Sequence, residues 1–70
     1  MNNTIEVIIN GFPEKILDGT TIAELILRFQ EGDIDLMVEL NHRFVYPRHY
    51  SDTTLSNGDQ IEFINPNFGG

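Results

Sequence analysis

Only one segment of this chain has the periodicity of a helix, and clear helix signals bound it. Thr21 and Glu24 have the spacing of a capping box, in which each side chain accepts a hydrogen bond from the backbone of the other residue. Gly32 is a natural stop, because glycine readily adopts the left-handed conformation that ends many helices. We therefore predict a helix over residues 21–31. Its apolar face would consist of Ile22, Leu25, Ile26 and Phe29.

The rest of the chain has the pattern of short strands separated by turns. Apolar and polar residues alternate from residue 4, and Asn10-Gly11 is a hairpin signal because both residues tolerate a positive φ. Pro13 has no N–H to donate, so it belongs at the start or the edge of the returning strand. The expected strands cover residues 4–10, 14–17, 36–40, 44–46 and 60–65, with a turn at 57–59 and a short helical turn within 47–56.

This order of elements, β-β-α-β-β-β, predicts a two-layer α+β domain. One helix with one apolar stripe covers one face of a mixed sheet of four to five strands, and the apolar first and last strands lie centrally. Seventy residues leave room for one core. Pro66 cannot continue a central ladder. We therefore predict one domain over residues 1–65 and a flexible C-terminal tail over residues 66–70.

The charge balance restricts the classes of partner. Four basic and eleven acidic residues give a net charge of −7. Binding to nucleic acid or to an anionic membrane depends on Lys and Arg, so neither is an expected partner, whereas a basic protein surface is favoured. The chain has no cysteine, which excludes disulfides and thiolate sites. Without a signal peptide or a bilayer-spanning apolar run, we expect the protein in the cytoplasm.

Candidate catalytic and metal-binding residues are few. His42 and His49 are separated by seven positions, with Asp52 nearby, but a metal site needs converging ligands. Ser51 and Ser56 have no companions for a nucleophilic triad. We expect solvated turn residues here, with no catalytic residue and no metal ligand.

The C-terminus carries the most suggestive chemistry. The last three residues are Phe68, Gly69 and Gly70. A terminal pair of glycines also occurs in frayed ends, so it does not decide a function alone. However, a C-terminal glycine has an unhindered carboxylate, and a pair without side chains can pass through a slot too narrow for other residues. Such an end suits a carboxylate that another enzyme activates.

With these features the chain resembles the β-grasp, or ubiquitin-like, fold, and within it the ThiS-like and MoaD-like sulfur carriers. His42 departs from the glycine that both groups commonly have at this position. Pro47-Arg48 followed by Tyr50 resembles the thiazole (thiamine) carriers, whereas Asn65-Pro66 resembles the molybdopterin carriers. The matching segments are Asn10-Gly11, Thr21 to Leu25, Val38-Glu39-Leu40-Asn41, Pro47-Arg48, Leu55 to Glu62 and Gly69-Gly70.

The resemblance implies a protein cosubstrate rather than an enzyme. A ThiF-like or MoeB-like enzyme would use ATP to adenylate Gly70, and a sulfur donor would then displace AMP and leave a thiocarboxylate. Phe68 and Gly69 would thread the tail into the partner. The sulfur would pass to an acceptor enzyme such as thiazole synthase, and the carrier itself would bind no cofactor.

In β-grasp carriers the sheet face opposite the helix is the docking face. We hypothesise that Phe44, Tyr46 and Phe63 contribute to it, because an exposed apolar patch marks a partner site. Three alternatives stay open. They are a MoaD-like carrier for molybdopterin or another sulfur-containing metabolite, a ubiquitin-like protein modifier, and a plain interaction module with a frayed tail.

Overall fold

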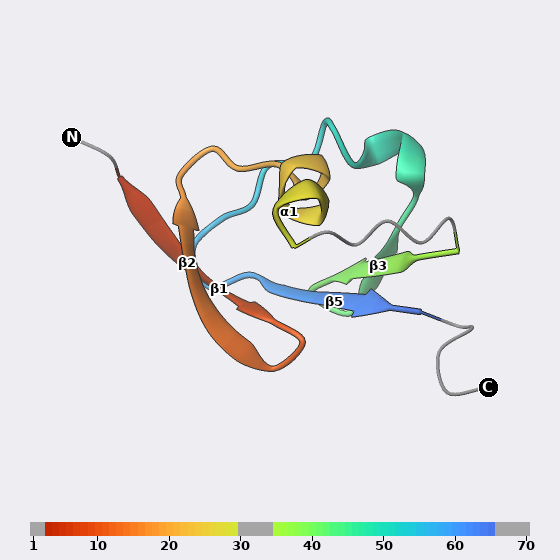
Figure 1. Ribbon diagram of the computed structural model, residues 1–70, viewed down its shortest axis with the longest axis horizontal. Helices are drawn as coiled ribbons and strands as arrows, with labels where there is room; N and C mark the ends of the chain where they lie inside the picture. The colour runs from red at the N-terminus through yellow and green to blue at the C-terminus, as the bar shows by residue number, and fades with distance from the viewer. Residues whose placement is uncertain (1–2, 30–34, 66–70) are drawn as a thin grey trace.

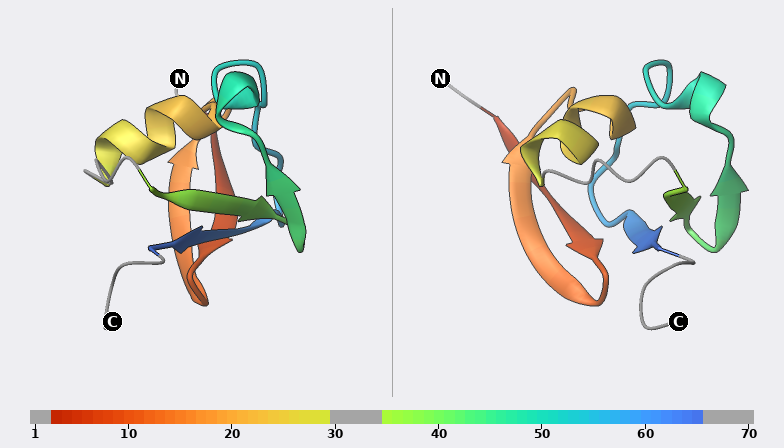
Figure 2. Two further views of the ribbon diagram at one scale, coloured as in Figure 1. Left: turned by 90° about the vertical axis from the view of Figure 1, so that its right-hand side faces the viewer. Right: turned by 45° about the vertical axis from the view of Figure 1, so that its right-hand side comes forward.

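The computed structural model describes residues 3–29 and 35–65 (Figure 1). Its strands are β1 (Thr4–Ile9), β2 (Phe12–Leu17), β3 (Met37–Leu40), β4 (Arg43–Val45) and β5 (Gln60–Ile64), and its helices are α1 (Ile22–Arg28) and the 3₁₀ helix η1 (Pro47–His49). The strands form one sheet in the order β2-β1-β5-β3-β4, with β1 and β5 parallel and all other neighbours antiparallel. The predicted two-layer α+β fold is confirmed, because α1 lies over one face of this mixed sheet (Figure 2).

The first hairpin follows directly from its turn residues. Asn10 and Gly11 have φ angles of 50° and 87°, as a two-residue hairpin loop requires. The tight loop places Phe12 opposite Ile9, so β2 begins two residues earlier than predicted. Pro13 lies within β2, which is an edge strand, where a residue without an N–H costs no central ladder bond.

The capping box of α1 is confirmed. The Thr21 hydroxyl accepts from the Glu24 N–H at 3.2 Å, and a Glu24 carboxylate oxygen accepts from the Thr21 N–H at 2.9 Å. The helix ends at Arg28, with Phe29 as its C-cap, which is earlier than predicted. At Phe29 the backbone leaves helical geometry, with φ −95° and ψ 6°. The predicted stop at Gly32 lies outside the described residues.

The loop after η1 closes onto the start of α1. The Ile22 N–H donates to the Thr53 carbonyl at 3.0 Å, and the Ala23 N–H donates to the Tyr50 carbonyl at 2.9 Å. These bonds satisfy N–H groups that have no partner within the first turn of a helix. Leu55, which is buried, lies in the same loop. The loop therefore holds α1 against the sheet.

The core lies between α1 and the sheet. The helix contributes the buried Ile22 and Leu25, and the half-buried Ile26 and Phe29 pack beside them, as predicted for this face. The predicted central position of the first and last strands is also confirmed, because β1 and β5 are neighbours inside the sheet. The remaining buried residues are Val7, Ile9, Ile16, Leu36, Val38, Leu55, Ile61 and Phe63.

Candidate docking face

The sheet face opposite α1, called the open face below, carries a row of residues across three strands. In register, Glu39 of β3 lies opposite Glu62 of β5 and opposite Phe44 of β4. Side chains alternate along a strand, and the neighbouring Val38 is buried in the core. Glu39, Glu62 and Phe44 therefore all point away from the helix.

A second row on the open face is apolar. Met37 of β3 lies opposite Ile64 of β5. Tyr46 follows β4, and its ring meets that of Phe44 edge to face, with centroids 4.8 Å apart and planes at 88°. Phe44 and Tyr46 are 44% and 53% exposed. Together Met37, Phe44, Tyr46 and Ile64 form what we call the apolar patch.

Of the three residues predicted for docking, the structure brings two together and separates the third. Phe44 and Tyr46 are exposed neighbours, whereas Phe63 is only 9% exposed and belongs to the core. Phe63 is paired with Val38, so both side chains point toward α1. The expectation that Phe63 faces a partner is therefore dropped. The sequence reasoning missed Met37 and Ile64 as members of the apolar patch.

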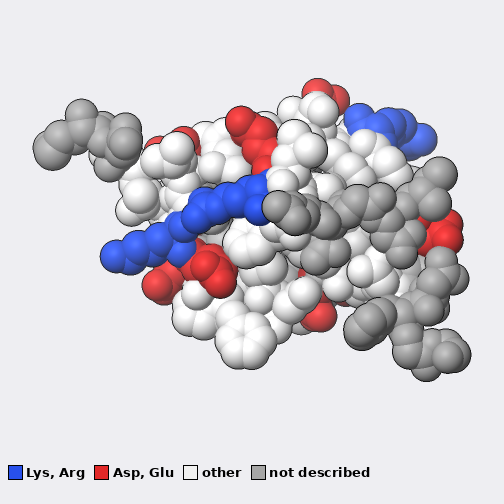
Figure 3. Space-filling model, viewed as in Figure 1, with Lys and Arg blue, Asp and Glu red and all other residues white. Residues whose placement is uncertain are grey.

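Charged groups flank the apolar patch. The Arg48 guanidinium carbon lies 4.9 Å from the centre of the Tyr46 ring, which is cation–π distance. The Glu39–Glu62 pair lies on the other side of Phe44. On the face shown in Figure 3, basic atoms gather in two separate places rather than in a continuous basic surface.

The fold also determines where the C-terminal tail leaves the body. β5 is parallel to β1 and antiparallel to β3, so its end lies near the Asn10 turn and near Met37, which begins β3. Ile64, the last residue of β5, therefore belongs to the apolar patch and lies two positions before Pro66, where the predicted tail begins. The predicted tail residues Phe68, Gly69 and Gly70, with the rest of 66–70, lie outside the described residues.

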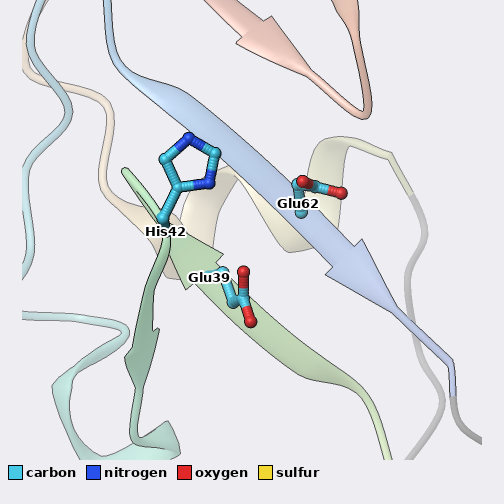
Figure 4. Close-up of side chains that lie close together, drawn as sticks. All are labelled: Glu39, His42 and Glu62. Atoms are coloured by element: carbon cyan, nitrogen blue, oxygen red, sulfur yellow. The ribbon is translucent and has the colours of Figure 1, made fainter.

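A cluster on the open face was not predicted. Glu39, His42 and Glu62 each place one potential ligand atom within 4.8 Å of the others (Figure 4). The sequence reasoning considered His42 only with His49, because Glu39 and Glu62 are far apart in sequence and only the pairing of β3 with β5 joins them. His49 instead accepts a long hydrogen bond from the Arg48 Nε at 3.4 Å.

A mixed sheet on one helix, with the first and last strands parallel at its centre, defines a β-grasp protein. The chain belongs to the ThiS family, whose model matches residues 7–70. Its fold matches the solved structure of a thiamine biosynthesis protein (ThiS) from Geobacter metallireducens, with a TM-score of 0.82 and 25% identity over 94% of this chain and 100% of that one. No curated protein matches the sequence.

Neither helix in the described part of the chain is long and apolar enough to cross a bilayer.

Proposed function

We propose that this chain is a sulfur carrier of thiamine (thiazole) biosynthesis and that its C-terminal Gly70 becomes a thiocarboxylate. The observation that carries the proposal is the family match, which spans residues 7–70 and so includes the terminal glycine pair. The solved relative is a thiamine biosynthesis protein that shares the whole fold. The end of the described chain supports the same function, since Ile64, the last residue of β5, lies opposite the exposed Met37 of the apolar patch.

The proposed chemistry needs only a free end from the carrier. A free carboxylate is a poor electrophile. A partner enzyme transfers AMP from ATP to the Gly70 carboxylate, releasing pyrophosphate and giving an acyl-adenylate. Hydrosulfide (HS⁻) supplied by a sulfur donor then attacks the carbonyl carbon and forms a C–S bond. The C–O bond to AMP breaks, AMP leaves, and loss of the S–H proton gives the thiocarboxylate. The chain has no cysteine, so the terminal carbonyl carbon is the place where this protein can hold the sulfur covalently. The chain is thus a cosubstrate, and the catalytic groups and ATP belong to its partner.

The open face is the proposed docking surface for the adenylating enzyme and then for the sulfur acceptor, which we propose is a thiazole synthase. Phe44 and Tyr46 supply exposed aromatic area, which is enriched at binding hot spots. The acidic Glu39 and Glu62 lie beside them, so the open face favours a partner surface that has apolar groups next to basic groups. Since β5 ends within this patch at Ile64, one partner can bind the patch and also receive the terminus.

The test is the intact mass of the protein recovered from its own cells with an N-terminal tag and a free C-terminus. The proposal predicts a species in which one terminal oxygen is replaced by sulfur. In a reconstituted reaction with ATP and the adenylating enzyme, deletion of Gly70 should abolish AMP transfer. Removal of residues 1–2 from the other end is the matched control and should leave AMP transfer intact. Full activity without Gly70 would end the proposal.

One sequence feature favours a second candidate, a MoaD-like carrier. Asn65-Pro66, immediately before the tail, is the feature that resembles molybdopterin carriers. The two candidates share the activation step and differ in the acceptor. Transfer of sulfur from the isolated thiocarboxylate to a thiazole synthase, compared with transfer to a molybdopterin synthase subunit, distinguishes them. A ladder of conjugates on lysines of other proteins would instead indicate a ubiquitin-like modifier.

A further inference from the structure

We propose that Glu39, His42 and Glu62 form a binding site for a divalent transition-metal ion and that Zn²⁺ fits the site best. One ligand atom of each residue lies within 4.8 Å of the other two. In Figure 4 Glu39 comes from β3, Glu62 from β5 and His42 from the turn after β3, and all three side chains lie on one side of the sheet. This inference does not depend on the proposed function.

Two of the three ligands are held by the sheet itself. Glu39 and Glu62 lie directly opposite each other on antiparallel strands, a position that brings Cβ atoms to about 4.5–5.5 Å. A tetrahedral Zn²⁺ ion, with ligands at about 2.1 Å, holds its ligand atoms roughly 3.4 Å apart. Rotation of the side chains can close the remaining gap, because Glu62 and His42 are exposed and Glu39 is half-buried.

The charges at this position favour a cation. Two carboxylates directly opposite each other repel, which makes the pair unfavourable in a sheet. Within residues 3–29 and 35–65, neither carboxylate forms a salt bridge or a side-chain hydrogen bond. A divalent ion between Glu39 and Glu62 would cancel both charges. Relief of this repulsion therefore adds to the free energy of metal binding.

His42 determines which class of ion fits. Asn41 and His42 have φ angles of 52° and 69°, and this left-handed turn brings the imidazole to the two carboxylates. An imidazole with two carboxylates suits Zn²⁺ and similar transition metals, whereas Mg²⁺ and Ca²⁺ prefer oxygen ligands alone. Three protein ligands leave a coordination position open to water or to a side chain of another molecule.

The experiment is an NMR titration of the full chain, prepared without a polyhistidine tag, with ZnCl₂. We expect saturable binding of one ion, with shifts centred on residues 39, 42 and 62. His42→Gly and Glu62→Gln should each weaken binding by roughly tenfold or more, since loss of even an outer-shell partner costs about 10–100-fold. The matched control is His49→Ala, which removes the other histidine and should leave affinity unchanged. MgCl₂ should not shift the His42 ring signals.

Three results would overturn the proposal. They are the absence of saturable shifts at millimolar ZnCl₂, shifts centred on His49, and unchanged affinity in both His42→Gly and Glu62→Gln. The same spectra show whether a variant loses metal binding because it unfolds or because it lacks a metal-ligating side chain. In a folded variant, the amide signals of β1, β2 and α1 stay at their wild-type positions.

Discussion

The side-chain oxygen of Asn10 accepts a hydrogen bond from the backbone N–H of Phe63 at 2.8 Å, across 53 residues of sequence. The backbone N–H of Asn10 donates to the Ile61 carbonyl at 2.9 Å, as the last ladder bond between β1 and β5. β1 then turns away into the hairpin, and the Asn10 side chain takes the place of the next backbone carbonyl. This bond ties down the end of β5, just before the tail.

Replacement of Asn10 by glycine should therefore loosen the end of β5. Asn10→Gly keeps the positive φ of the turn but removes the acceptor, so we expect a loss of about 1 kcal/mol in the free energy of unfolding. Hydrogen exchange at the Phe63 amide should accelerate. Asn10→Asp, which keeps an acceptor oxygen and tolerates the same backbone, is the control and should preserve protection. Equal exchange at Phe63 in all three proteins would show that the bond does not hold the strand.

The adjacent residues Asn41 and His42 should respond in opposite directions to the same substitution. Both have positive φ. His42→Gly removes a steric cost, so we expect a gain of about 0.5–1 kcal/mol in stability. The Asn41 side chain, however, donates to Asp59 at 3.0 Å and accepts from the Gln60 N–H at 2.9 Å. Asn41→Gly removes the same steric cost but also these two hydrogen bonds. We therefore expect a net loss of about 1 kcal/mol in the free energy of unfolding.

Urea unfolding of the wild type and the two glycine variants measures this difference. A gain in both variants would mean that the Asn41 bonds contribute nothing to stability. A loss in both would mean that the His42 side chain supports the fold.

Phe44→Asp should impair activation without unfolding the domain. Phe44 is exposed in the apolar patch, so a charge there would be buried against a docked partner. We expect the rate of adenylation to fall by about tenfold or more, as for a hot-spot residue. Phe12→Asp is the matched control, because Phe12 is 70% exposed on the opposite edge strand β2. Equal adenylation rates in the two variants, each shown to be folded by its thermal unfolding, would exclude the open face as the docking surface.

Tyr50 should make the fold sensitive to alkaline pH. Its hydroxyl oxygen is buried and has no hydrogen-bond partner among the described residues, and burial raises the pKa of this phenol above its ordinary value. The folded state thus favours the neutral form. Tyr50 ionises near pH 10 in the unfolded chain and only at higher pH in the folded protein. Stability is therefore unaffected below about pH 10 and falls as the pH rises further.

Tyr50→Phe should remove this alkaline loss and, at neutral pH, keep stability or raise it by up to about 1 kcal/mol, because a buried hydroxyl without a partner disappears. Tyr46→Phe changes an exposed tyrosine and should leave the loss in place. Urea unfolding at neutral pH and above about pH 10 compares the variants. An unchanged alkaline loss in Tyr50→Phe would assign the effect to another group.

Short local sequence signals were enough to predict the helix and the strands of this protein. These signals act over a few positions, so they can be recognised without knowing which distant segment packs against them. They are the Thr21–Glu24 capping box, the Asn10-Gly11 turn and the alternation of apolar residues. The terminal Gly69-Gly70 can also be recognised from sequence, because the reactivity of a C-terminal carboxylate does not depend on the fold. Pairing between distant strands is different. It depends on free-energy differences summed over the whole sheet, which no short segment contains.

Only the tertiary structure could therefore decide which side chains share a surface. The pairing of β3 with β5 turned Phe63 into the core and placed Glu39 opposite Glu62, with His42 beside them. A shift of one residue in that register would reverse every side chain between the two faces. The sequence by itself determined that a β-grasp body ends in two glycines. The register of its central strands decided which side chains form the open face.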